Sequence, residues 1–247
     1  SLERRIRNLM GQFGLPGFVD FQRAVLSQRP LFDRMVAEIS VGVTEFFRHP
    51  EQFRLLREEI FPYLASFSVL KVWSAGCATG EEAYSLAILL DELGLLARTR
   101  LFATDLNHYL LELAASGLFP SAPLGVNRDN YLAGGGPRYF DAYVAHGGRY
   151  LKVRDDLRKA VLFHRHSLVD EGVFNEFQLI VCRNVLIYFD RQTQEKVLAL
   201  FARSLHRDGF LVLGPRDGLI QAASAQGFVP HASGSHIYRY RGGGGHD

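Results

Sequence analysis

The chain has 247 residues, of which 47% are apolar and 22% are charged, and its formal net charge is +2. This composition supports a folded core and excludes a disordered chain, while the small net charge is only weak evidence for a polyanionic partner. No run of about 18 apolar residues could span a membrane, and the segment SLERRIRNLM has no apolar signal core. Cys77 and Cys182 are too few for a disulfide scaffold, so we expect a cytoplasmic protein with reduced thiols.

Residues 1–40 predict a small helical domain. Apolar residues recur at helical spacing from Leu2 to Phe13, and the same pattern returns over residues 18–26 and 31–39. Glycine and proline separate the first two of these helices. A further helix is expected over residues 50–64.

From residue 69 onward the pattern alternates between short apolar strands and amphipathic helices. The expected strands cover residues 69–73, 101–104, 161–164, 177–182 and 209–214. Alternating residues over 138–144 and 149–153 favour two further strands. The overall order predicts a doubly wound α/β sheet, in which ligands bind at the carboxyl ends of the parallel strands.

The first motif, Gly76 to Glu82, lies between an expected strand and its helix. Its small residues let the backbone approach a ligand, and the start of the helix offers free N–H groups. Two carboxylates, Glu81 and Glu82, would repel a pyrophosphate but would suit a ligand with an ammonium or sulfonium group. The simpler alternative is that both acids only complement the helix dipole.

The second motif is Asp105, at the end of the next expected strand. An acid in this place accepts hydrogen bonds from ribose hydroxyls, although it could instead cap the following helix. Together with the glycine loop it indicates a nucleoside that carries a positively charged tail. S-adenosylmethionine fits that description.

The third motif, residues 182–190, follows the most apolar strand. Arg183 and Asn184 would lie in the catalytic zone at the carboxyl end of that strand, and Tyr188 could face a bound methyl donor. The alternative is that Tyr188 packs over the edge of the sheet.

The fourth motif, residues 43–48, joins the helical domain to the sheet domain. Arg48 could pair with a ligand carboxylate and Thr44 could donate its hydroxyl, although an arginine at a domain interface is more common. Phe46 and Phe47 are expected to be core residues.

Six segments in one order closely resemble the CheR-type chemotaxis receptor methyltransferases. They are VTEFFRHPEQF, VWSAGCATGEEAYSLAILL, FATDLN, RYLKVRDDLRKAVLF, CRNVLIYFDRQTQEKVLALF and LHRDGFLVLG. The resemblance implies an α/β fold: a Rossmann-like S-adenosylmethionine-dependent methyltransferase domain over residues 41–240, after a shortened N-terminal helical domain over residues 1–40. It also implies an inserted antiparallel β-subdomain at about residues 134–156, and the glycine-rich residues 241–247 are expected to form a flexible tail.

The resemblance further implies that the protein transfers a methyl group from S-adenosylmethionine to glutamate side chains of chemoreceptor cytoplasmic helices. The products would be glutamyl methyl esters and S-adenosylhomocysteine. Tyr188 and Arg48 would be catalytic. The residues implied to hold the cofactor are Thr44, Arg48, Gly76, Ala78, Glu81, Glu82, Asp105, Ser167, Leu168, Arg183 and Asn184.

The implied partner is the cytoplasmic domain of a chemoreceptor. Arg4, Arg5 and Arg7 would dock its acidic helices, and the β-subdomain could hold a receptor C-terminal peptide. Three positions depart from the family pattern: Gly42 and Ser167 replace frequent asparagines, and Gly214–Asp217 replaces a Gly-x-Ser-Glu sequence.

Two other functions stay open at this stage. A nucleic-acid methyltransferase is disfavoured because no basic stripe with interleaved aromatic residues is present. A CheR-like module that binds the cofactor and docks to a signalling protein, with a different methyl acceptor or none, is the stronger alternative. The histidines have no metal-ligand spacing, so no metal is expected.

Overall fold

The core of the molecule is a seven-stranded sheet, which is contained in the part of the chain that the computed structural model describes, residues 2–40, 44–217 and 220–242. Its strands, in spatial order, are β6 (Val161–Arg165), β2 (Thr99–Asp105), β1 (Leu70–Ala75), β7 (Phe177–Cys182), β8 (Leu205–Leu213), β10 (Ile237–Tyr240) and β9 (Phe228–Pro230). The first five run parallel, and β10 and β9 are antiparallel to their neighbours. This order, with the chain reversing direction across the sheet beside β1, confirms the expected Rossmann-like fold.

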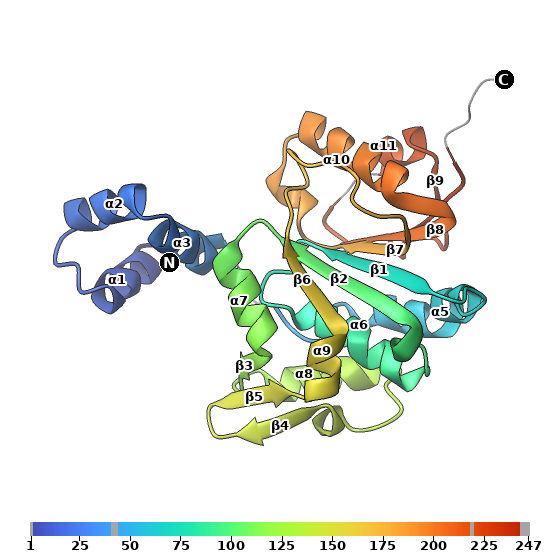
Figure 1. Ribbon diagram of the computed structural model, residues 1–247, viewed down its shortest axis with the longest axis horizontal. Helices are drawn as coiled ribbons and strands as arrows, with labels where there is room; N and C mark the ends of the chain where they lie inside the picture. Colours follow the sequence, from blue (N-terminus) through green and yellow to red (C-terminus); the bar gives the residue numbers. More distant parts are fainter. Residues whose placement is uncertain (1, 41–43, 218–219, 243–247) are drawn as a thin grey trace.

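Successive side chains of the central strands point to opposite faces of the sheet and belong to two separate hydrophobic clusters. In β1, Val72 belongs to one buried cluster and Trp73 to the other, and in β8 Val212 and Leu211 divide in the same way. Because side chains alternate across a strand, helices must cover both faces of such a sheet. Figure 1 shows α10 (Arg191–Ser204) and α11 (Ile220–Ala225) on one side, with α6 (Glu81–Glu92) and α9 (Asp155–Ala160) on the other.

The N-terminal segment forms three helices, α1 (Leu2–Gln12), α2 (Phe18–Ser27) and α3 (Arg29–Ser40). They pack around Leu9, Phe21 and Val25 and project to one side of the sheet (Figure 1). Helix α3 contacts α7 (His108–Ser116), so the small helical unit lies beside the carboxyl ends of the strands.

The predicted helix over residues 50–64 is present, with a π-helical turn in its middle. It comprises α4 (Pro50–Leu55), the π-helical segment Leu56–Ile60 and α5 (Phe61–Leu64). None of the helices in residues 2–40, 44–217 and 220–242 has the length and apolar character needed to cross a membrane.

A second sheet has three antiparallel strands in the order β3 (Leu118–Pro120), β5 (Tyr150–Val153) and β4 (Val144–Gly147). Helix α8 (Leu124–Ala133) lies between β3 and β4 in the chain. The strand expected over residues 138–144 was wrong except at Val144, where β4 begins, because Phe140–Ala142 is a 3-10 turn that buries Phe140. The sheet also recruits β3, which precedes the expected insertion at about residues 134–156.

Candidate active site

A cavity of about 560 Å³ opens at the carboxyl ends of β1, β2 and β7. Its wall is built from the first turn after each of these strands, from residues 44–48 and from helix α3. The predicted site residues in this wall are Thr44, Arg48, Gly76, Ala78, Glu82, Asp105, Arg183, Asn184 and Tyr188. Residues from four separate segments therefore meet at the edge of the sheet where the fold predicts a ligand.

The loop after β1 has a backbone that requires its glycines. Gly76 has a φ of +75°, and a Cβ atom placed there would lie 2.4 Å from the Val185 side chain. Gly80 has a φ of +98°, and its Cβ atom would lie 2.9 Å from the Ala114 side chain. Ala78 also has a positive φ, of 47°. The loop is thus held tightly between two neighbouring segments, and its backbone can face the cavity.

The two adjacent glutamates have different surroundings. Glu82 lies in the cavity wall, accepts a hydrogen bond from the Ser74 hydroxyl at 2.8 Å and lies 3.6 Å from the Arg183 guanidinium. Glu81 instead accepts hydrogen bonds from Thr79 at 2.6 Å and Thr44 at 3.3 Å, and it is not part of the wall. Burial raises the pKa of both carboxyls, although the Arg183 charge and these hydroxyls favour their ionised forms.

Asp105 joins the two loops that border the cavity. One of its oxygens accepts a hydrogen bond from the Ala78 N–H at 2.9 Å, and the other accepts one from the Asn107 N–H at 2.9 Å. Asn107, and not Asp105, is the N-cap of α7, since its side chain accepts a hydrogen bond from the Leu110 N–H. The capping role that was the alternative for Asp105 is therefore filled by another residue, and Asp105 lies in the cavity wall.

Arg183 is almost completely buried, with 4% of its side chain exposed. It donates a hydrogen bond to the Arg48 backbone carbonyl, faces Glu82 and lies over the Phe53 ring at 5.3 Å. Its Nε atom is buried without a hydrogen-bond partner in the described part of the chain. Buried donors are normally paired, so a polar group of a bound ligand would satisfy this one.

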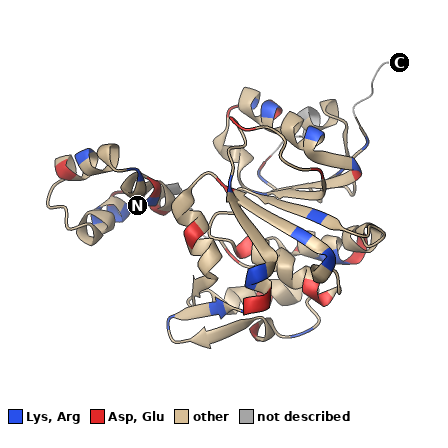
Figure 2. Cartoon of the chain, viewed as in Figure 1, with Lys and Arg blue, Asp and Glu red and all other residues tan. Residues whose placement is uncertain are grey.

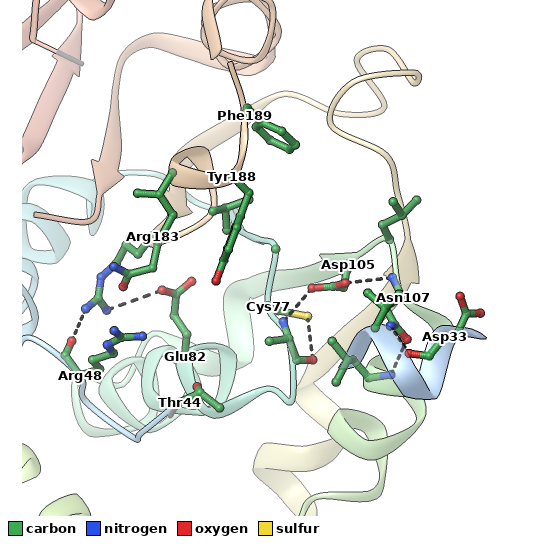
Figure 3. Close-up of a pocket in the computed structure, with 18 of the residues that line it drawn as sticks. Asp33, Thr44, Arg48, Cys77, Glu82, Asp105, Asn107, Arg183, Tyr188 and Phe189 are labelled. Atoms are coloured by element: carbon green, nitrogen blue, oxygen red, sulfur yellow. Dashed lines mark hydrogen bonds and ion pairs between the residues drawn. The ribbon is translucent and has the colours of Figure 1, made fainter. Parts of the chain in front are cut away.

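Tyr188 points into the cavity from above, between the Arg183–Glu82 pair and Asp105 (Figure 3). Tyr188 is 65% exposed. Phe189 also borders the cavity (Figure 3). The alternative, in which Tyr188 packs over the edge of the sheet, does not agree with this exposure.

The linker that carries Thr44 and Arg48 is anchored by two phenylalanines. Phe46 and Phe47 are buried, as expected for core residues. Their N–H groups donate to the Asn127 side chain at 3.2 Å and to the Ser85 hydroxyl at 2.9 Å. The Arg48 guanidinium forms no ion pair with any residue that the structure describes, so it is available to a carboxylate.

Some predicted site residues lie elsewhere. Ser167 and Leu168 are not part of the cavity wall, and the Ser167 hydroxyl donates to Asp170 at 2.8 Å. Gly42, one of the departures from the family pattern, lies outside the described residues.

The three arginines proposed for docking lie in α1. Figure 2 shows basic residues in this helix and elsewhere in the helical unit. Arg7 pairs with Glu3 at 2.7 Å, and Arg5 donates to the Glu38 carbonyl at the end of α3. Arg4 is exposed and has no ion pair within residues 2–40, 44–217 and 220–242. Of these three arginines, Arg4 is therefore the one without a partner among the residues that the structure describes.

Several residues of the wall were not predicted. Helix α3 contributes Arg29, Phe32, Asp33 and Val36, and Asn107 donates a hydrogen bond to the Asp33 carbonyl at 2.7 Å. No local pattern in α3 marks a ligand site. Asn107 lies two residues after Asp105, and this closeness to a predicted site residue was the sequence signal that could have indicated it.

The raised carboxyl pKa values predict that cofactor binding is linked to protons. In the free protein, burial favours protonated Glu82 and Asp105, so their contribution to stability is lost as the pH rises above the ordinary carboxyl value of about 4. A cationic ligand favours the ionised forms, so binding should release protons and should weaken as the pH falls through the raised pKa values. Calorimetric titration in two buffers of different ionisation enthalpy measures this release, and equal heats in both buffers would contradict the linkage.

The fold and the cavity together place acidic and basic side chains at the edge of the sheet where α/β proteins bind ligands. The CheR methyltransferase S-adenosylmethionine-binding domain matches residues 42–233. The chain belongs to the CheR methyltransferase family, and S-adenosylmethionine is the cofactor of this domain.

Several known proteins are similar over most of their length. A Pseudomonas putida protein with the provisional name methyltransferase Cher3 is 39% identical over 241 residues, which span 97% of this chain and 88% of that protein. A chemotaxis protein methyltransferase of Listeria innocua is 31% identical over 225 residues, 90% of this chain and 83% of that protein. Among solved structures, a TehB-like methyltransferase from Corynebacterium glutamicum is 17% identical with a TM-score of 0.45, over 83% of this chain and 90% of that one.

Proposed function

We propose that this protein transfers the methyl group of S-adenosylmethionine to glutamate carboxylates on the cytoplasmic helices of a chemoreceptor, forming glutamyl methyl esters in the cytoplasm. The observation that carries the proposal is the composition of one cavity: Glu82 and Asp105 lie in the same wall as Arg48 and Tyr188. The relatives named chemotaxis protein methyltransferases support the choice of acceptor.

The wall fits the cofactor by its chemistry. Glu82 would hold the cationic amino-acid end, and Asp105 would accept hydrogen bonds from the ribose hydroxyls. Arg48 and the unpartnered Nε atom of Arg183 would bind the cofactor carboxylate. S-adenosylmethionine, when bound, supplies a methyl group already activated by its sulfonium centre.

The protein itself needs little acid–base chemistry. A glutamate with an ordinary pKa of about 4.3 is ionised at neutral pH, so no general base is required. The remaining tasks are to align the acceptor carboxylate and to exclude water. Tyr188 is suited to the first task because a hydrogen bond orients a carboxylate without neutralising it. An ion pair would reduce its nucleophilicity.

The acceptor must also be held outside the cavity. We assign this role to the helical unit, with Arg4 as the docking arginine of α1 that has no ion pair among the described residues, since the acidic acceptor helices and a basic helix attract one another. The small sheet offers strands β3 and β4 as edges to which an extended receptor peptide could add.

The proposal is tested with methyl-labelled S-adenosylmethionine and chemoreceptor cytoplasmic fragments from the same organism. Mild alkali converts glutamyl methyl esters to volatile methanol, so released label counts esters directly. We expect release that disappears when the receptor glutamates are replaced by alanine. If the protein binds the cofactor but no label is released with any receptor fragment, the acceptor assignment is wrong and a docking role gains support.

The Tyr188→Phe variant should retain cofactor affinity and lose turnover. A hydrogen bond to a charged group contributes about 1.5–3 kcal/mol, so kcat should fall roughly 10- to 100-fold. Tyr139→Phe is the matched control, because Tyr139 is 82% exposed and lies outside the cavity wall. Equal turnover by the two variants would remove Tyr188 from the catalytic residues.

A further inference from the structure

We propose that Asp217 is a positioning residue that fastens the segment carrying Arg183, Asn184 and Tyr188 to the end of strand β8. Asp217 does not line the cavity, and only 2% of it is exposed. The role goes beyond the proposed function, because it concerns how the cofactor wall is held whatever the methyl acceptor is.

The Asp217 carboxylate connects two loops that are 30 residues apart in the chain. The same carboxylate oxygen accepts two hydrogen bonds, one from the Asn184 N–H at 2.9 Å and one from the Gly214 N–H at 2.6 Å. Asn184 is the second residue after β7, and Gly214 is the first after β8. The two neighbouring parallel strands are thus joined at their carboxyl ends by one buried side chain.

The backbone of both loops depends on this connection. Asn184 has a φ of 60°, in the left-handed region, which asparagine adopts more readily than most residues with a side chain. Gly214 has no room for a side chain, because a Cβ atom there would lie 2.7 Å from the Asp217 carboxylate and 2.8 Å from the Asn184 nitrogen. The contact between the loops is therefore close and specific.

The environment keeps the carboxylate committed to backbone donors. Burial raises the pKa of Asp217, while the N–H groups of Asn184, Gly214 and Ile187 favour its ionised form. Ile187 lies one residue before Tyr188, in the segment that enters the cavity. Losing the carboxylate would leave buried N–H groups without an acceptor and would free the segment to move.

The consequence for the site follows from position. Arg183, Asn184 and Tyr188 all lie within five residues of the fastened nitrogen and all line the cavity. A shift of about 1 Å in reacting or binding groups can cost roughly 100-fold in rate. Asp217 therefore sets the geometry of the cofactor wall without touching the cofactor.

The test measures S-adenosylmethionine affinity by calorimetry, together with thermal stability, in three variants. Asp217→Ala should weaken binding by about tenfold or more. Asp217→Asn keeps an oxygen that can accept the same two hydrogen bonds, so its affinity should stay within about threefold of wild type. Gly214→Ala keeps the carboxylate but forces the two loops apart, and it should weaken binding as Asp217→Ala does.

Asp190→Ala is the control. Asp190 ends the same loop and also accepts a hydrogen bond from a backbone N–H, that of Thr193 at 2.8 Å, but it is exposed and does not line the cavity. The Asp190→Ala variant should have a lower melting temperature and an unchanged affinity for S-adenosylmethionine. If Asp217→Ala and Gly214→Ala also lose only stability, Asp217 is merely structural and the proposal is overturned. Since binding needs no acceptor, this result is independent of whether receptor glutamates are methylated.

Discussion

Replacement of Glu82 by glutamine should weaken S-adenosylmethionine binding by roughly 30-fold or more, because removing one partner of a buried charge pair costs about 2–5 kcal/mol. Glu82 faces the cavity, and its carboxylate is only 17% exposed. Glutamine has the same shape and can still accept the hydrogen bond from Ser74. A loss of affinity would therefore be caused by the missing negative charge of Glu82. Calorimetric titration with S-adenosylmethionine at pH 7 measures this affinity.

Glu81→Gln is the matched control on the next residue. Glu81 accepts hydrogen bonds from two threonine hydroxyls, which an amide oxygen can also accept, and it has no contact with the cavity. Its effect on affinity should be within about threefold, as for other substitutions away from a ligand. Similar losses in both variants would show that the first turn of α6 binds through its combined charge and not through Glu82.

Replacement of Glu92 by alanine should reduce the free energy of unfolding by about 3–5 kcal/mol, because a buried arginine loses its partner. Only 1% of the Glu92 side chain is exposed. It accepts hydrogen bonds from Arg57, from Tyr131 and from Tyr143, the last at 2.6 Å. Burial and the neighbouring carboxylate raise the pKa of both tyrosines, so their hydroxyls stay protonated and donate.

This network joins the π-helical segment, α8 and the turn before β4 to the end of α6. Urea denaturation measures the loss, and Glu92→Gln should lose less because an amide oxygen still accepts from the tyrosines. Glu58→Ala is the control, since Glu58 is exposed one residue from Arg57 and should change stability by no more than about 0.5 kcal/mol. A Glu92→Ala effect as small as this would contradict the structural role.

The local patterns predicted much of the site. Gly76 and Gly80 were recognisable because tight turns with positive φ leave few alternatives to glycine, and both φ values are positive in the structure. Asp105, Arg183 and Asn184 follow strands, and the carboxyl ends of parallel strands meet at one edge. Ser167 met the same criterion and still lies outside the cavity wall, and its hydroxyl donates a hydrogen bond to Asp170.

Sequence patterns alone predicted the five parallel strands, the fold class and the loops that carry ligand-binding groups, but they did not predict β3, β9 or β10. These follow from period-2 and period-3.6 patterns and from turn residues, all of which act over a few neighbouring positions. Only the tertiary structure decided that Glu82 and not Glu81 faces the cavity, and that α3 completes the wall. It also decided that Asp217 holds Asn184 across 33 positions and that Glu92 joins three segments. Burial and long-range hydrogen bonds depend on which distant residues meet, and no local pattern contains that information.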